Sequence, residues 1–207
     1  MAENGARAKK YRKMADQREH VVTRPGMYVG STDTEELPSW VLRFTEAGEL
    51  RLERETVEVS PALFKVYDEV VTNALDASVK DASVKSIKIN ITPTEICCKN
   101  DGEGIPVEDH PDFPGTYVPT LVFGHLLTST NYDDTDEGAA AVAGTNGLGV
   151  KLANIFSTRF SVSVADAKTG MTFEQVWRGG SAPPGPPPCG RLLFVETCLK
   201  TACFALL

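Results

Sequence analysis

Hydrophobic and polar positions follow two different periods along this chain, and the longest regular stretch has the period of a helix. Across residues 60–80 the apolar side chains recur at about 100° per residue. Ser60 is a favourable N-cap, and Pro61 suits the first helical position, where its missing N–H costs nothing. The predicted helix buries one apolar face, which consists of Leu63, Phe64, Tyr67, Val70, Val71, Ala74 and Leu75.

The opposite face of this helix carries Glu69, Asn73 and Asp76 within roughly 60° of one another. The face is short of Lys and Arg, so it is not typical of an ion-paired surface helix. A carboxylate can orient or deprotonate a water, and an amide oxygen one turn away can ligate a hard cation such as Mg²⁺. The alternative is a polar face that only meets solvent.

The rest of the pattern mostly has period two, which predicts strands. Residues 40–59 alternate apolar and charged side chains, and Ala47 and Gly48 are suited to turn a hairpin there. A short helix is expected at 120–127, and residues 111–119 read as a connecting loop. The other predicted strands are 27–29, 86–92, 95–99, 160–164 and 171–177.

One predicted strand, 95–99, runs into Asp101, Gly102, Glu103 and Gly104. This order fixes a carboxylate at a strand end beside backbone that has no side chains in the way. Turns use the same residue types, so a turn without further function is the alternative.

A glycine-rich segment later in the chain is suited to approach an anion. It opens a helix, so backbone N–H groups would point at a phosphate, and its terminal lysine would add positive charge. The spacing fits neither a Walker A loop nor the dinucleotide fingerprint of oxidoreductases. Upstream, Ser129, Thr130 and Asn131 suit ribose or phosphate oxygens, or caps and turns. The segment consists of Gly144, Thr145, Asn146, Gly147, Leu148, Gly149, Val150 and Lys151.

The composition of the chain restricts which classes of fold and function fit these predictions. With 207 residues, 42% of them hydrophobic, the chain can bury the core of one α/β domain. A net charge of −7 argues against a general nucleic-acid-binding surface. The five cysteines lack paired spacing, so we expect them to be reduced and the protein to be soluble and intracellular. We divide the chain into an arm (1–19), a main domain (20–178) and a Pro-rich tail (179–207), which is either one more strand or unrelated to the fold.

Six stretches, taken in order, carry a more specific pattern over about residues 19–178. They read RPGMYVGS, FKVYDEVVTNALDAS, NDGEGIPVEDH, YVPTLVFGHLLTSTNYDD, GTNGLGVKLANIFSTRFSV and FEQVW. Together they resemble the ATPase domain of eukaryotic-type type II DNA topoisomerases. The resemblance implies an α+β fold of the GHKL (Bergerat) type, with a mixed, mostly antiparallel sheet and helices packed on one face.

The resemblance also implies roles for the residues already singled out. Glu69 would be the general base for the water that attacks the γ-phosphate, Asn73 would ligate Mg²⁺, and Asp101 would accept a hydrogen bond from the adenine amino group. Ser129, Thr130 and Asn131 would contact ribose and phosphate. The family's lid usually has an aromatic residue and an alanine where Leu148 and Val150 stand here, which leaves main-chain contacts to phosphate intact. Those contacts would come from Gly144, Thr145, Asn146, Gly147, Leu148, Gly149, Val150 and Lys151.

The function implied is that of an ATP-binding, dimerising N-terminal module that couples ATP binding and hydrolysis to DNA strand passage. Its partners would be ATP, Mg²⁺ and a second copy that closes the ATPase gate. DNA would be bound by domains absent from this chain, no membrane is involved, and the nucleus is the expected location. The family's next domain supplies a lysine to the γ-phosphate, so we expect this chain alone to hydrolyse ATP slowly and not to cleave DNA. The alternative is a truncated, non-enzymatic ATP-binding fragment.

Overall fold

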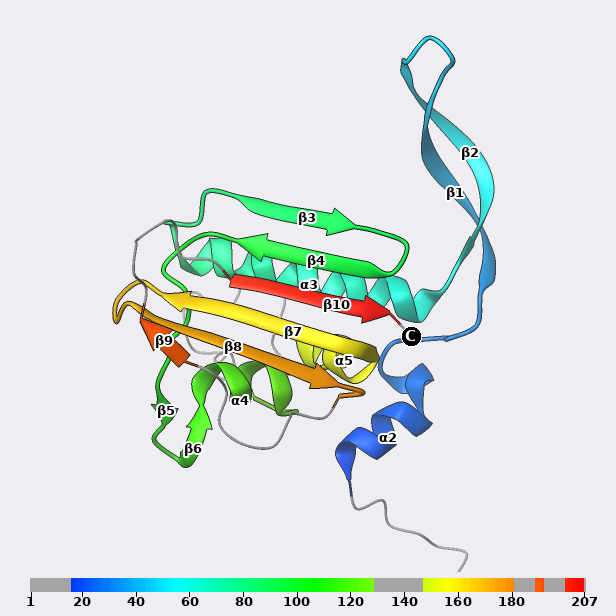
Figure 1. Ribbon diagram of the computed structural model, residues 1–207. Helices are drawn as coiled ribbons and strands as arrows, with labels where there is room; N and C mark the ends of the chain where they lie inside the picture. Colours follow the sequence, from blue (N-terminus) through cyan, green and yellow to red (C-terminus); the bar gives the residue numbers. More distant parts are fainter. Residues whose placement is uncertain (1–15, 129–146, 181–188, 192–199, 207) are drawn as a thin grey trace, which may run out of the picture.

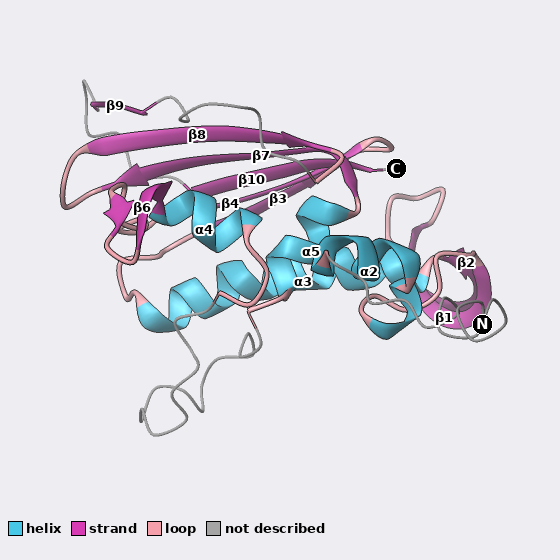
Figure 2. Cartoon of the chain, turned by 90° about the horizontal axis from the view of Figure 1, so that it is seen from below, coloured by secondary structure: helices cyan, strands magenta, loops and turns pink. Residues whose placement is uncertain are grey.

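A six-stranded sheet with helices on one face forms the body of the protein (Figures 1 and 2). The computed structural model describes residues 16–128, 147–180, 189–191 and 200–206. The strand order is β3-β4-β10-β7-β8-β9, and each of these neighbouring pairs is antiparallel. The predicted α+β fold is therefore confirmed. The strands of this sheet are β3 (Ile87–Ile91), β4 (Glu95–Asn100), β7 (Ser157–Asp166), β8 (Met171–Arg178), β9 (Cys189–Arg191) and β10 (Lys200–Leu206).

The longest helix, α3 (Pro61–Lys80), runs below the sheet and has the predicted ends. The hydroxyl of Ser60 caps it by accepting a hydrogen bond from the N–H of Leu63 at 3.4 Å. Its buried face differs from the predicted one: Leu63, Phe64 and Leu75 are exposed. The helix instead buries a narrow stripe with a spacing of four, because only one side of it meets the sheet. The stripe consists of Ala62, Val66, Val70 and Ala74.

The core lies between this helix layer and the sheet. Phe160 on β7 and Phe173 and Trp177 on β8 are almost completely buried. Phe160 packs edge-on against Trp177 with ring centroids 5.7 Å apart, an arrangement that the quadrupoles of the two rings favour. The helices that cover this cluster, on the same side of the sheet as α3, are α4 (Val118–Gly124) and α5 (Gly149–Ile155), and α2 (Gln17–Thr23) lies beside α5.

Two local predictions were wrong. Residues 27–29 are not a strand, because Pro25–Met27 forms a 3-10 turn, η1. The expected loop 111–119 contains β6 (Phe113–Tyr117), which pairs with β5 (Asp109–His110) in a small separate sheet. The helix expected at 120–127 is confirmed, although it begins two residues earlier and ends at Gly124.

The tail contributes a strand to the middle of the sheet. Strand β10 lies between β4 and β7, with Lys200 opposite both Asn100 and Val164. Without it, both neighbouring strands would have unpaired edges. Cys97 on β4 is disulfide-bonded, so the expectation of reduced cysteines is wrong for Cys97.

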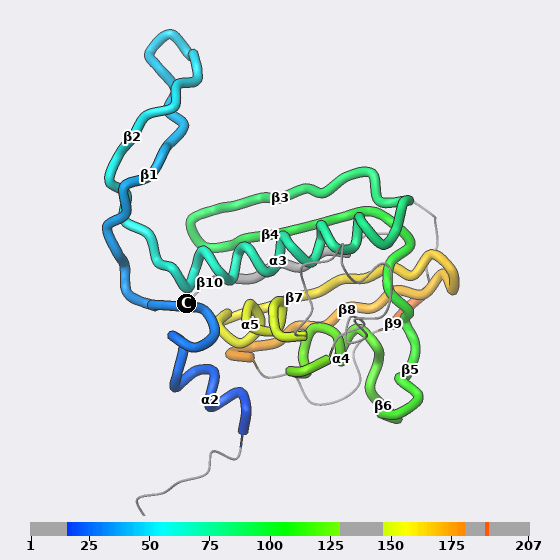
Figure 3. The backbone as a smooth tube through the Cα atoms, turned by 180° about the vertical axis from the view of Figure 1, so that it is seen from behind, coloured from blue at the N-terminus to red at the C-terminus, as the bar shows by residue number. Residues whose placement is uncertain are grey.

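The predicted hairpin is confirmed and projects away from the body (Figures 1 and 3). Its strands are β1 (Glu35–Phe44) and β2 (Leu50–Val59), which pair with each other and, among the strands that the structure describes, with no other. The turn uses Gly48 at φ +80°, a backbone conformation that favours glycine. None of the helices in the described part of the chain is both long and apolar enough to cross a membrane.

Candidate functional site

Glu69 and Gly149 come from distant parts of the sequence and meet at the contact between α3 and α5 (Figure 2). A Cβ placed on Gly149 would overlap with Oε2 of Glu69 and would lie 3.0 Å from its Cδ. The carboxylate therefore packs directly against the backbone of the glycine-rich segment. Only a glycine leaves room for it there.

The other carboxylate oxygen of Glu69 is held by Lys65, one turn earlier on α3. The Nζ of Lys65 lies 2.6 Å from Oε1 of Glu69, and the side chain of Glu69 is 19% exposed. The hydrogen bond to Glu69 raises the pKa of Lys65. The expectation that this face has no ion pair is therefore wrong. Both oxygens of the predicted base are positioned, one by a cation and one by the glycine-rich backbone.

Asn73 lies one turn after Glu69 and is exposed. Its Nδ2 donates a weak hydrogen bond to the backbone carbonyl of Glu69 at 3.3 Å. This bond orients the amide, so Oδ1 is left to accept from or ligate another group. The acid and the amide thus stay on one side of α3, clear of apolar packing, as the sequence predicted.

The turn after β4 is tied to the far end of the same helix. Asp81, the C-cap of α3, accepts a hydrogen bond from the N–H of Glu103 at 2.7 Å. A Cβ on Gly102 would lie 2.6 Å from Oδ2 of Asp81, and one on Gly104 would overlap with the carbonyl oxygen of Ala165. These two glycines therefore allow close packing within the protein. They do not leave the open backbone that the sequence suggested.

The carboxylate of Asp101 has structural partners in this turn. Its Oδ1 accepts from the N–H groups of Lys85 at 2.7 Å and Ser86 at 2.9 Å, and its Oδ2 accepts from the Ser86 hydroxyl at 3.0 Å. The N–H groups of Ser86 and Lys85 lower the pKa of Asp101. Its contact with adenine stays a prediction. The carboxylate does fix the start of β3 against the end of β4.

The neighbouring residue, Asn100, faces the helix layer. It follows Ile96 and Cys98 on the buried side of β4 and is itself buried. Its Nδ2 donates to the carbonyl of Asp101 at 2.9 Å. A buried amide at the end of an otherwise apolar strand face is a candidate for ligand recognition.

The glycine-rich segment is described from Gly147, which has φ +62°. Leu148 is half-buried, and Val150 and Lys151 are buried on α5. The Nζ of Lys151 donates to the carbonyl oxygen of Thr128 at 2.5 Å, and desolvation lowers the pKa of Lys151 to about 8. Contrary to expectation, this side chain points into the protein instead of adding charge at the surface. The remaining predicted contacts lie outside the described residues; they are Ser129, Thr130, Asn131, Gly144, Thr145 and Asn146.

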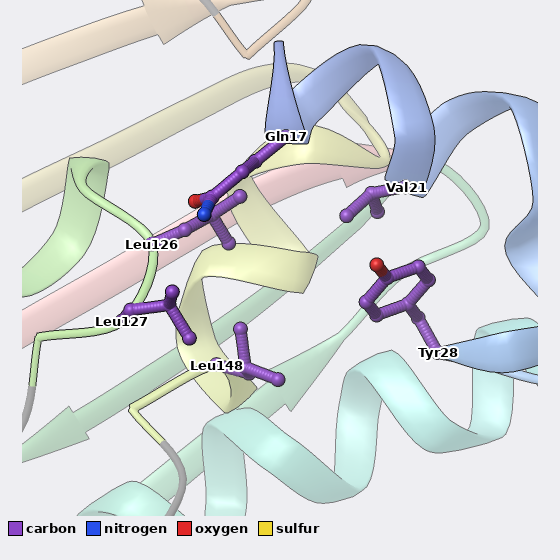
Figure 4. A pocket seen from close by; sticks show the side chains of 6 residues that line it. All are labelled: Gln17, Val21, Tyr28, Leu126, Leu127 and Leu148. Atoms are coloured by element: carbon purple, nitrogen blue, oxygen red, sulfur yellow. The ribbon is translucent and has the colours of Figure 1, made fainter. Parts of the chain in front are cut away.

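A cavity of about 180 Å³ lies near this segment, between α2, the chain after α4 and the start of α5 (Figure 4). It is smaller than the ~300–1,000 Å³ of ordinary small-molecule sites. Its lining is mostly apolar, which does not suit a triphosphate. The lining residues are Gln17, Val21, Tyr28, Leu126, Leu127 and Leu148.

Two of the three segments singled out in the sequence therefore contact the third, α3. The glycine-rich segment contacts it at Glu69, and the turn after β4 contacts its C-cap, Asp81. The sequence pattern of the histidine kinase-, DNA gyrase B- and HSP90-like ATPases matches residues 58–178, which include all three. The chain belongs to this ATPase family.

Similar sequences show to which branch of the ATPase family the chain is related. The chain is 41% identical to DNA topoisomerase 2 of Candida glabrata over 90% of its length, and 42% identical to that of Saccharomyces cerevisiae over 86%. It spans only 13% and 12% of those proteins. It is therefore homologous to part of eukaryotic DNA topoisomerase 2.

Solved structures identify that part as the ATPase region. The ATPase region of Saccharomyces cerevisiae topoisomerase II bound to ICRF-187 (dexrazoxane) matches with a TM-score of 0.85 and 37% identity, over 96% of this chain and 51% of that one. The ATPase and transducer domains of DNA topoisomerase II from Balamuthia mandrillaris match with a TM-score of 0.84 and 34% identity, over 96% and 50%. The chain thus spans about half of each solved region.

The sequence analysis missed three residues around this candidate site: Lys65, Asp81 and Asn100. The i, i+4 spacing of Lys65 and Glu69 could have revealed the first. The alternation of Ile96, Cys98 and Asn100 could have placed the third on the inner face. The contact of Asp81 with Glu103 spans 22 residues, so no local pattern reveals it, although the N–H and hydroxyl of Ser83 also donate to the carboxylate of Asp81.

Proposed function

We propose that this chain is the ATP-binding part of a type II DNA topoisomerase and that it hydrolyses ATP at the site on α3. The observation that carries the proposal is the packing of the Glu69 carboxylate against Gly149, with Asn73 one turn further along the same side of the helix. Family membership supports ATP as the ligand.

Glu69 acts as the general base in this proposal. Lys65 and the backbone at Gly149 keep its two oxygens in place, so one oxygen can orient and deprotonate the water that attacks the γ-phosphate. The glycine-rich segment, 144–151, donates main-chain N–H groups to the phosphates. Ser129, Thr130 and Asn131 contact the ribose and phosphates.

Asn73 holds Mg²⁺ through Oδ1. Its amide oxygen is a hard ligand on an exposed side chain, which fits a hard cation. Within the described residues no group of three or more His, Cys, Asp or Glu side chains could hold a metal ion, so phosphates and waters would supply most of the other ligands. The bound ion would neutralise charge that develops on the phosphates.

Asn100 is the better candidate for recognition of the adenine. Its amide lies on the buried, helix-facing side of β4, whereas the carboxylate of Asp101 already accepts three hydrogen bonds from Lys85 and Ser86. An amide oxygen can accept from the adenine amino group. Asp101 then supports the site by fixing the turn.

In the longer protein, ATP binding would close a gate between two copies of this region and be coupled to DNA strand passage. DNA would be bound by other parts of that protein, and its location would be the nucleus. Homology to eukaryotic DNA topoisomerase 2 supports these proposals.

Calorimetric titration with ATP, with and without Mg²⁺, followed by single-turnover hydrolysis, tests the proposal. Glu69→Gln should retain ATP binding and lose about 10²–10⁴ in hydrolysis rate. Glu174→Gln, an exposed position on β8, should change neither quantity. Unimpaired hydrolysis by Glu69→Gln would remove Glu69 from this role. Binding without any turnover by the unchanged chain would favour the non-enzymatic alternative.

A further inference from the structure

Two arginines point outward at the end of the sheet where β7 begins and β8 ends. Arg159 on β7 lies directly opposite Arg178 on β8. Their neighbours, Phe160 and Trp177, are buried on the helix side of the sheet. Successive side chains of a strand point to opposite faces. Both arginines therefore lie on the face that no described helix covers, and both are exposed (Figure 2).

This pair of like charges lacks a counter-charge. Like charges directly opposite each other in antiparallel strands are destabilising. On the hairpin, Arg43 also lies opposite an arginine, Arg51, but its guanidinium donates two hydrogen bonds to Glu55, at 2.9 and 2.7 Å. Among the residues that the structure describes, no carboxylate forms an ion pair with Arg159 or Arg178. The repulsion between them is therefore not offset within this part of the protein.

A third arginine, Arg18 on α2, lies beside the same strand end. A Cβ placed on Gly180, two residues after Arg178, would lie 2.5 Å from Nε of Arg18 and 3.0 Å from its Nη2. The Nε of Arg18 is buried and has no hydrogen-bond partner within the described part of the chain. The nearby acids of α2, Asp16 and Glu19, form no ion pair with it there, and Asp16 instead accepts from the N–H of Arg18 at 2.9 Å. Buried polar groups nearly always have a partner, and an anion is the partner that suits a guanidinium.

We propose that Arg18, Arg159 and Arg178 form a binding site for a single phosphate group, carried by a phosphorylated serine or threonine of a partner protein. Guanidinium groups bind phosphate through paired N–H···O bonds, and arginine clusters are a recurrent means of recognising phosphorylated peptides. A phosphoserine brings about −1.5 to −2 charges and three acceptor oxygens at pH 7. A shared anion would convert the repulsion between Arg159 and Arg178 into a joint attraction.

The surrounding charges favour one phosphate group over a nucleic-acid backbone. Ala205 of β10 lies opposite both Glu95 and Arg159, so Glu95 is in the same row about 10 Å away, two strand spacings across the sheet. Glu174 precedes Arg178 by four residues on the same face of β8, a distance of about 13 Å. Duplex DNA carries a charge every ~1.7 Å, so its further phosphates would meet these carboxylates. A single phosphate group meets only the arginines.

Fluorescence anisotropy of a labelled, otherwise uncharged peptide with one phosphoserine tests the site on the full chain. All measurements are made without nucleotide, because ATP also carries phosphate groups. Binding is expected with a dissociation constant below about 1 mM, and the peptide without its phosphate should bind at least about tenfold more weakly. Equal binding of the two peptides, or none up to about 1 mM, would overturn the proposal.

Two further ligands distinguish the sources of the phosphate group. Inorganic phosphate should displace the peptide only at concentrations above the dissociation constant of the peptide. Phosphate that binds at least about tenfold more tightly than the peptide would overturn the partner protein as the source. A short DNA duplex that binds more tightly than the phosphopeptide would overturn the choice of a single phosphate group.

Variants locate the site. Arg178→Gln should weaken binding of the phosphopeptide at least about tenfold, and Arg178→Lys should restore only part of it, because lysine keeps the charge but loses the paired geometry. The matched control is Arg51→Gln, another exposed arginine opposite an arginine, which should change the affinity less than about threefold. Without ligand, urea unfolding should show Arg178→Gln to be at least as stable as the unchanged chain, because one of two like charges is gone. Full affinity in Arg178→Gln, or an equal loss in Arg51→Gln, would overturn the proposal.

Discussion

The ammonium of Lys65 lies 2.6 Å from Oε1 of Glu69, one turn along α3, while Oε2 of the same carboxylate packs against Gly149. The first contact is local and the second joins segments 80 residues apart in the sequence. Together they fix the direction of the carboxylate before any nucleotide binds. The two contacts can be removed separately.

Lys65→Met should lower the rate of ATP hydrolysis about tenfold, because Oε1 of Glu69 loses its partner and the base loses its orientation. The pair is partly exposed, so the free energy of unfolding should change by less than about 1 kcal/mol. Single-turnover hydrolysis and urea unfolding measure the two effects. Lys65→Arg should restore most of the rate. Equal rates in Lys65→Met and the unchanged chain would show that Glu69 does not depend on Lys65.

Gly149→Ala should disable hydrolysis without destabilising the fold. The new Cβ would overlap with Oε2 of Glu69 and push the carboxylate away, whereas alanine favours the helix by about 1 kcal/mol over glycine. We expect at least a tenfold loss in rate. Gly26→Ala is the control, because nothing lies within 4 Å of a Cβ at that position. Full activity in Gly149→Ala would mean that the contact relaxes in the active state.

The sequence predicts most of the fold because most elements depend on local patterns. Ser60 and Pro61 fix the start of α3, and alternation fixes the strands. The buried side of α3 was predicted less well: Phe64 is apolar yet 67% exposed, because burial depends on where the next layer lies. The central position of β10 depends on pairing with distant strands, which no pattern within the tail reveals.

The candidate site remains a prediction, but the structure shows how its residues lie. Residue types and spacing singled out Glu69 and Asn73, and the structure keeps both on one side of α3. The direction of a flexible side chain depends on tertiary packing, so the inward course of Lys151 toward Thr128 could not be predicted. The alternation that predicted the hairpin says which side chains share a face. It does not say whether anything covers that face.

Asn100→Ala should reduce preference for ATP over GTP, because the amide is the proposed acceptor for the adenine amino group. Loss of one hydrogen bond in a buried site should weaken ATP binding by about tenfold. Titration calorimetry with ATP and with GTP measures the two affinities. Asn100→Asp retains an acceptor and should keep more of the preference than alanine does. Unchanged affinity for ATP in Asn100→Ala would exclude the contact.

Asp101→Asn should instead destabilise the fold at neutral pH. The N–H groups of Ser86 and Lys85 hold the pKa of Asp101 below its ordinary 3.8. Its ionised form therefore stabilises the folded protein above that value, and this contribution is lost as the pH falls through the lowered pKa. Urea unfolding should show the variant to be less stable near pH 7, with the gap closing well below pH 4. A gap that is independent of pH would contradict the role of the charge.

Lys151→Met should remove the increase in the free energy of unfolding that Lys151 causes above about pH 8. Burial lowers the pKa of Lys151 from 10.5 to about 8, so between these values the unfolded chain holds a proton that the folded protein has released. Stability then rises with pH through this window, by at most about 1.4 kcal/mol per pH unit for one proton. Other groups, including the Cys98 thiol, whose pKa is raised by burial, cancel in the difference between the two proteins. The free energy of unfolding of the unchanged chain minus that of Lys151→Met should therefore increase between about pH 8 and pH 10. A difference that stays level across this range would show that the ammonium remains charged beside the carbonyl of Thr128.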